Sequence, residues 1–129
     1  MKNIFTFRAA SIAAQEADDS YIVGFADSRS QPQEYIILQR SVYPDGEPDE
    51  DEPDTYFLEI NDQATSGYGG IQSATLSQDS FTLVLADDNE YSDGLTAVTV
   101  RFDAAQLPAD LKQYLGQIFH GTDCTFTAS

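Results

Sequence analysis

Basic residues are scarce in this chain. The sequence of 129 residues has 6 lysines and arginines against 22 aspartates and glutamates, which gives a formal net charge of −16. Nucleic-acid and anionic-membrane binding need clustered Lys and Arg to replace counterions, so both are disfavoured. The folded chain will attract cationic surfaces instead, although the same acidity also fits solubility or adaptation to a salty cytoplasm. The basic residues are spread out, at Lys2, Arg8, Arg29, Arg40, Arg101 and Lys112.

Cysteine, tryptophan and long apolar runs are also rare or absent. A single cysteine, Cys124, excludes an internal disulfide. No apolar run approaches the length of a membrane span, and the N-terminal MKNIFTFRAASIAAQEADDS lacks the apolar core and cleavage site of a signal peptide. We therefore expect a soluble cytoplasmic protein that does not bind membranes.

The residues that are present predict a folded chain. The apolar share is 41%, with 8 Phe and 7 Tyr, more than a disordered acidic chain carries. At this length we expect a single domain over residues 1–129. Between its strands lies PDGEPDEDEPD, at 44–54, whose prolines and like charges predict an extended acidic loop.

Apolar alternation with a period of two predicts about seven strands, and a period near 3.6 then predicts one helix. The helix should run from Leu107 to Phe119, with Pro108 in its first turn and Gly121 ending it. We expect an α+β fold: a mostly antiparallel sheet with this amphipathic helix packed on it. The strand around Gly24 has apolar residues on both sides, which predicts an interior strand with both faces partly covered. The expected strands are 4–14, 21–28, 34–42, 55–62, 71–78, 80–86 and 95–102.

No residue pattern indicates catalysis or a cofactor. His120 stands at the predicted helix end, where a cationic ring interacts well with the dipole, and Cys124 has no basic neighbours to lower its pKa. Zinc spacings, a phosphate-loop lysine and a dinucleotide fingerprint are all absent. In the acidic loop Asp45, Glu47, Asp49 and Asp51 alternate in a way that invites Ca²⁺, but prolines oppose the tight wrap of an EF-hand. We expect neither a metal nor a cofactor.

One stretch, YFLEINDQATSGYGGI at 56–71, combines a strand with a polar segment and three glycines around Tyr68. The glycines free the backbone for positive φ. The stretch is then either a tight loop whose tyrosine folds back on the core or a loop that presents an aromatic anchor beside carboxylates.

Four blocks in this order resemble the immunity protein 10 family of bacterial polymorphic toxin systems. They are GFAD at 24–27, YIILQR at 35–40, EINDQ at 59–63 and YGGI at 68–71, followed by a helix ending in IF at 118–119. The resemblance implies a cytoplasmic antidote, encoded beside a toxin, that blocks the toxin by binding and without catalysis. It brings no catalytic residues with it, and the shared blocks either hold the fold together or bind the toxin.

Charge and resemblance together predict a cationic toxin domain as the partner, because an acidic inhibitor would be steered onto it quickly. An alternative is an acidic inhibitor of another basic protein, for example a nucleic-acid mimic with a regular double row of carboxylates. A small enzyme is the lesser alternative and would need a closed polar pocket. The oligomeric state stays open. The predicted contact residues are Glu47, Asp49, Glu50, Asp51, Glu52, Glu59, Asp62 and Tyr68.

Overall fold

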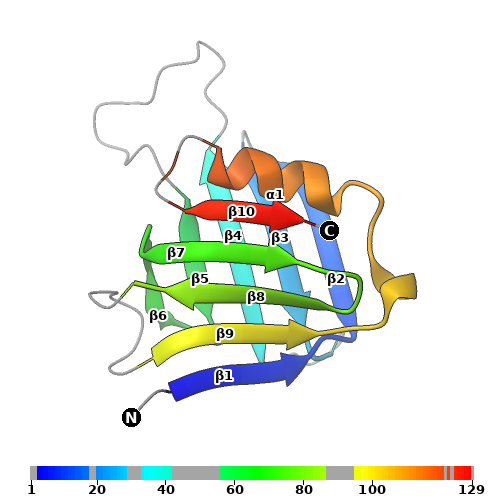
Figure 1. Cartoon of the computed structure of the whole chain (residues 1–129), viewed down its shortest axis with the longest axis horizontal. Coiled ribbons are helices and arrows are strands. Elements are labelled where there is room, and N and C mark those ends of the chain that lie inside the picture. The colour runs from blue at the N-terminus through cyan, green and yellow to red at the C-terminus, as the bar shows by residue number, and fades with distance from the viewer. Residues whose placement is uncertain are drawn as a thin grey trace.

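The computed structural model describes residues 3–17, 20–28, 33–41, 56–86, 95–120, 122 and 124–128, which form two five-stranded sheets and a helix (Figure 1). Sheet A has the order β1 (Asn3–Arg8), β9 (Leu95–Arg101), β8 (Ser80–Leu85), β7 (Ile71–Leu76) and β10 (Thr125–Ala128). Sheet B has the order β2 (Ser11–Ala17), β3 (Ser20–Ala26), β4 (Tyr35–Ser41), β5 (Phe57–Ile60) and β6 (Asp62–Tyr68). A short 3₁₀ helix (Ala104–Gln106) precedes helix α1 (Leu111–Phe119).

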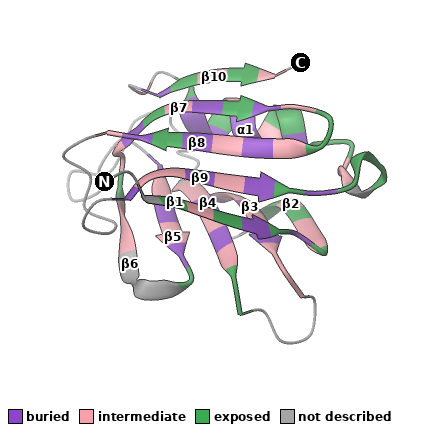
Figure 2. Ribbon diagram, turned by 60° about the horizontal axis from the view of Figure 1, so that its bottom comes forward, coloured by how far each residue is buried: buried purple, intermediate pink, exposed green. Residues whose placement is uncertain are grey.

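Pairing is mostly antiparallel, and the core lies between the two sheets. Only β1 with β9 and β10 with β7 run parallel among the pairs described. Buried residues alternate with more exposed ones along β7 and β8, so one face of each strand turns inward (Figure 2). The sheets meet where Phe25 of β3 stacks on Phe81 of β8, with ring centroids 5.1 Å apart.

Helix α1 packs on the inner face of sheet B beside β10, and so extends the layer that sheet A forms (Figure 1). Its apolar stripe is buried at Leu111, Leu115, Ile118 and Phe119. Tyr114 contacts Tyr21 of β3, with centroids 5.6 Å apart. The helix begins after Pro108, whose carbonyl accepts from the Leu111 N–H, so placing this proline in the first turn was wrong. Gly121 lies outside the described residues.

The α+β class is confirmed, but the described residues form ten strands where the sequence predicted about seven. The expected strand 4–14 is two strands in different sheets. Its alternation continues through the break, where the Ala9 N–H donates to the Arg101 carbonyl in sheet A and the Ala10 N–H donates to the Ala26 carbonyl in sheet B. The chain thus changes sheets within two residues, without a proline or glycine to mark the point.

Two further strands were not predicted. The polar stretch expected as a loop is edge strand β6, which Asn61 separates from β5 by taking a φ of 62°. The threonine-rich end of the chain contains β10, a strand of four residues. The expected strands at 71–78 and 80–86 pair as the hairpin of β7 and β8, which turns at Gln78 and Asp79, and a strand in the 95–102 region is confirmed. The predicted acidic loop at 44–54 and the segment 87–94 lie outside the described residues.

Candidate partner-binding face

The outer face of sheet B is an open surface built from alternate residues of its strands. No other described element packs on it, because α1 and sheet A both lie on the inner side. The strand around Gly24 is interior, as expected, and its outward residues are half-buried although no described element covers them. Strand register aligns the outward residues in two main rows: Ala13, Gly24, Ile37, Glu59 and Ser66, and beside it Gln15, Ile22, Gln39, Phe57 and Tyr68.

Tyr68 is the most exposed aromatic residue described on this face. Its side chain is 57% exposed and lies edge-on against Phe57, with ring centroids 5.3 Å apart. Glu59 is two positions along β5 from Phe57, so it is the diagonal neighbour of Tyr68, at a Cα separation of about 7–8 Å. The β5–β6 pairing therefore places an aromatic pair beside a carboxylate.

The Glu59 carboxylate is held by a neighbouring strand. The Tyr35 hydroxyl of β4 donates to Glu59 Oε2 at 2.5 Å, and Glu59 is half-buried. A short bond from a phenol to a carboxylate is of the strong, charge-assisted kind and fixes the orientation of both side chains. The carboxylate is consequently preorganised on the face.

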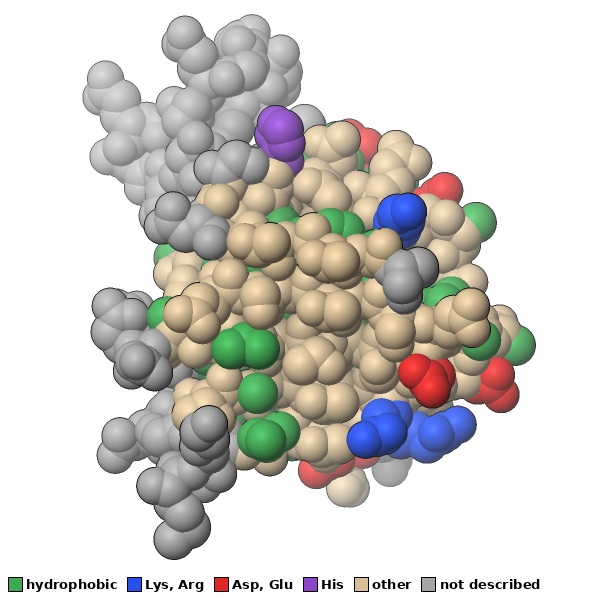
Figure 3. All heavy atoms as spheres, in the orientation of Figure 1, with side chains coloured by type: hydrophobic (Ala, Val, Ile, Leu, Met, Phe, Trp, Pro, Cys, Tyr) green, Lys and Arg blue, Asp and Glu red, His purple; other side chains and the backbone are tan. Residues whose placement is uncertain are grey.

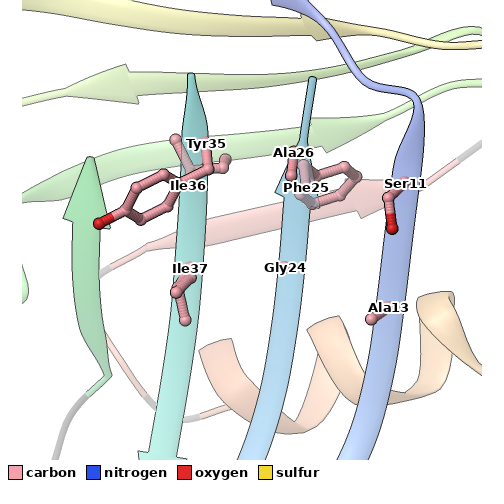
Figure 4. A pocket seen from close by; sticks show the side chains of 8 residues that line it. All are labelled: Ser11, Ala13, Gly24, Phe25, Ala26, Tyr35, Ile36 and Ile37. Carbon is pink, nitrogen blue, oxygen red and sulfur yellow. The ribbon is translucent and has the colours of Figure 1, made fainter. Parts of the chain in front are cut away.

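Next to this pair the face has a hollow of about 280 Å³ (Figure 4). Ala13, Gly24 and Ile37 contribute one row of its lining, while Ser11, Ala26 and Tyr35 contribute the next. The lining is almost wholly apolar. The hollow owes its shape to small outward residues on β2 and β3, which lie beside larger outward residues on β4.

The predicted contact residues are brought together only in part. Glu59 and Tyr68 share the outer face of sheet B. Asp62 begins β6, where it pairs with Ile60 at a bulge, and its side chain is not among those described. The loop residues of the prediction, Glu47, Asp49, Glu50, Asp51 and Glu52, lie outside the described residues, between the end of β4 and the start of β5.

Two of the four sequence blocks hold turns. In GFAD, Asp27 Oδ1 accepts from the Gln33 N–H at 3.0 Å, and the Asp27 N–H donates to the Glu34 carbonyl. In EINDQ, Asn61 Oδ1 accepts from the Tyr35 N–H at 2.7 Å, while the Asn61 N–H donates to the Tyr35 carbonyl at 3.0 Å. Asn61 has a left-handed backbone conformation, which asparagine adopts more readily than most residues, and it also binds the backbone of Tyr35 at the start of β4. These two properties explain why this turn contains an asparagine.

The block YGGI forms the corner where the chain leaves sheet B for sheet A. Gly69 and Gly70 have φ of 70° and 85°, which glycine adopts without strain. The buried Tyr56 hydroxyl anchors the corner: it accepts from the Ile71 N–H at 2.8 Å and lies 3.3 Å from the Ile71 carbonyl. The glycines thus shape a corner, and Tyr68 stays exposed instead of folding back on the core; its role as an aromatic anchor stays a prediction.

The block YIILQR joins the sheet to the helix. Ile36 and Leu38 are fully buried, and Arg40 Nη1 lies 3.2, 3.1 and 2.5 Å from the carbonyls of Gln117, Ile118 and His120. A guanidinium at the last carbonyls of a helix satisfies acceptors that have no partner within the helix and opposes the negative end of the dipole. Each block therefore contains residues that stabilise the fold.

The other candidate groups do not converge on a site. His120 is the residue after α1, as expected, and is exposed. Cys124 is buried, which raises the pKa of its thiol to about 12 and keeps it protonated. Within the described ranges, no group of three or more His, Cys, Asp or Glu side chains could hold a metal ion, and no helix is long and apolar enough to cross a membrane.

The outer face of sheet A differs chemically from that of sheet B. Its middle row consists of threonines, Thr6, Thr99, Thr82, Thr75 and Thr127, aligned across all five strands. Figure 3 shows this face as mainly uncharged, with apolar side chains at one side and basic and acidic ones toward the opposite edge. Among the described strands of sheet A, no acidic residue occurs.

Sequence reasoning missed the partners of Glu59 and Tyr68. Phe57, Tyr35 and Gly24 complete the face, and each comes from a pairing between strands that spacing alone does not give. The available signal was the apolar character of both sides of β3 and β4. On an open sheet face, such residues form an exposed apolar surface, a feature that often marks interaction sites in proteins.

The outer face of sheet B offers groups for binding: an exposed aromatic pair, a fixed carboxylate and an apolar hollow. The two packed sheets define a β-sandwich protein in which the outer face of sheet B is open. The chain matches the family described as Immunity protein 10 over residues 6–110, and it belongs to that family. Membership implies an immunity protein that neutralises a toxin, and it confirms the resemblance seen in the sequence. No curated protein and no solved structure gives a significant match.

Proposed function

We propose that this protein is a non-catalytic cytoplasmic antidote that binds a cationic toxin domain through the outer face of sheet B. The observation that carries the proposal is the exposed Tyr68–Phe57 pair beside the Glu59 carboxylate. Tyrosine is favoured at interface hot spots because it contributes a large contact area with little loss of rotamer freedom. A fixed carboxylate beside it selects a lysine or arginine of the partner.

The proposed surface extends from this face to Asp62 and to the acidic loop. Asp62 follows the β5–β6 turn, and the loop joins β4 to β5, which are neighbours in sheet B. The net charge of −16 favours a cationic partner, since complementary fields speed association and set its salt dependence. In this proposal the shared blocks maintain the scaffold, and the acidic loop adjusts recognition to one toxin.

The nucleic-acid mimic gains no support from the carboxylates whose side chains are described. Only Glu16 and Glu59 of these lie within strands, on β2 and β5. A mimic needs a regular double row on one face, whereas an antidote needs only a local acidic patch. The local arrangement of Glu59 therefore favours the antidote.

Co-expression tests the function. Each reading frame that flanks this gene is expressed in a sensitive host with and without this protein, and the purified product of a toxic one is mixed with this protein on gel filtration. We expect restored growth and a stable complex. Neither rescue nor a complex would remove the antidote proposal.

The cationic character of the toxin surface is tested separately by Glu59→Gln, with Thr82→Ala on the outer face of sheet A as the control. Loss of the charge should weaken binding and reduce its dependence on salt, because one ion pair across the interface is removed. If affinity and salt dependence stay unchanged in Glu59→Gln and in a loop with its carboxylates neutralised, the charge-based part of the proposal is wrong.

A further inference from the structure

The hollow on the outer face of sheet B lies over Gly24, which has no side chain, and beside the small residues Ser11, Ala13 and Ala26. A Cβ built at this glycine would meet only the Ile36 carbonyl oxygen, at 3.9 Å, an ordinary contact distance. Larger residues surround it: Ile37 and Tyr35 form one wall, while Phe25 and Ile36 turn inward beneath it (Figure 4). The open space is therefore a feature of the surface and does not result from loose core packing.

The volume and lining of the hollow set the kind of group that it can hold. Its volume is about 280 Å³, and an apolar cavity of about 150 Å³ already binds benzene in another protein. The lining offers almost no polar atoms, so a charged or strongly polar group would lose hydration without compensation. One aromatic or branched aliphatic side chain matches both the size and the chemistry.

The surroundings of the hollow add a charge requirement. In the strand register, Gly24 is opposite Ile37, and Ile37 is opposite Glu59. Neighbouring strands lie about 4.8 Å apart, so Glu59, which is two strands away from Gly24, lies about 10 Å from the hollow. Tyr35 lines the hollow and also holds Glu59 through its hydroxyl, which links the apolar and acidic parts of the face.

We infer that the hollow around Gly24 receives one large apolar side chain of the toxin, while Glu59 binds a lysine or arginine about 10 Å away on the same toxin surface. This inference rests on the proposed function and names the part of the face that anchors the partner. Hot-spot residues cluster in well-packed, desolvated pockets near the centre of an interface, and the rim around them is polar. The occupant is thus a knob-shaped apolar residue on a cationic protein surface.

The test fills the hollow. Gly24→Leu places a side chain in it, and Gly116→Leu is the matched control, because a Cβ at Gly116 of α1 meets nothing within 4 Å. Circular dichroism and melting first establish that both variants fold. We expect Gly24→Leu to weaken the complex with the toxin domain at least about tenfold and to leave its salt dependence unchanged, while Gly116→Leu binds as the wild type does.

A second measurement locates the contact independently of affinity. Ala13→Cys puts a thiol at the exposed rim of the hollow, and the native Cys124 stays unreactive because it is buried and protonated. Saturating toxin should slow labelling of the new thiol by a disulfide reagent at least about tenfold. This variant also serves if Gly24→Leu does not fold.

The outcomes separate the two proposals. If the wild type binds toxin but Gly24→Leu binds equally well, or the thiol at position 13 stays reactive in the complex, the hollow is not the anchor although the antidote function stands. If the wild type neither binds nor neutralises the toxin, the function fails, and the inference about the hollow fails with it.

Discussion

Replacing Tyr56 with phenylalanine should destabilise the fold without changing its surface. Tyr56 is 2% exposed, and its hydroxyl accepts from the Ile71 N–H at 2.8 Å where the chain passes between the sheets. The ring stays in Tyr56→Phe, so the contact with Phe119 is kept. What is lost is the acceptor of a buried N–H, which costs about 1–3 kcal/mol.

This free energy corresponds to a measurable melting shift. Unfolding entropy near 60 °C is about 2.1 cal/mol/K per residue, or roughly 270 cal/mol/K for a chain of this length, so each kcal/mol lowers Tm by about 4 °C. We expect Tyr56→Phe to melt about 4–11 °C below the wild type in a circular-dichroism scan. Tyr68→Phe removes the same atom from an exposed residue and should melt within about 1 °C of the wild type. Equal melting of all three proteins would refute the assignment of Tyr56 as the anchor of the corner.

Three further changes probe other parts of the fold. Arg40→Ala removes the guanidinium from the C-terminal carbonyls of α1 and should cost about 2–3 kcal/mol in urea unfolding, more than Arg40→Lys; equal stability would contradict its role as a cap. Asn61→Ala and Asn61→Gly both lose the side-chain hydrogen bond to the Tyr35 N–H. Asn61→Ala should be less stable than Asn61→Gly by about 1–2 kcal/mol, because alanine is strained at a φ of 62° and glycine is not. The reverse order of stability would argue against this strain. Burial raises the pKa of Cys124 from 9.0 to about 12, so its contribution to stability is complete below pH 9 and is lost as the pH rises toward 12. Cys124→Ser should show a weaker fall of stability over that window, and native protein at pH 8 should not react with a thiol reagent until it is unfolded.

The alternation of apolar residues predicts most of the strands, because period two directly reports which side of a strand is buried. The prediction fails where the same alternation continues although the chain passes from one sheet to the other. Phe5, Phe7 and Ala9 continue one pattern while the chain leaves sheet A, and the hydrogen bonds of Ala9 and Ala10 to different sheets are long-range contacts. Strand β6 is polar because it is an edge strand, and β10 is too short for a clear pattern.

The candidate site was predictable to the extent that it is local in sequence. Glu59 and Tyr68 belong to one hairpin, so a single stretch of sequence contains both. Gly24 and Tyr35 join them only through the pairing of β3 with β4 and of β4 with β5, which depends on register. A glycine within a strand can mark either a hollow on the surface or a β-bulge, and the sequence alone does not distinguish the two.

The affinity of Tyr68→Ala for the toxin domain tests the central claim most directly. Tyr68 is exposed, so its truncation should leave the melting temperature nearly unchanged, and calorimetric titration then reports the interface alone. We expect a Kd at least about 30-fold above that of the wild type, as for a hot-spot residue, and an unchanged Kd for Thr82→Ala on sheet A. A Kd for Tyr68→Ala equal to that of the wild type, or a loss of binding in Thr82→Ala instead, would contradict the assignment of the outer face of sheet B as the toxin-binding surface.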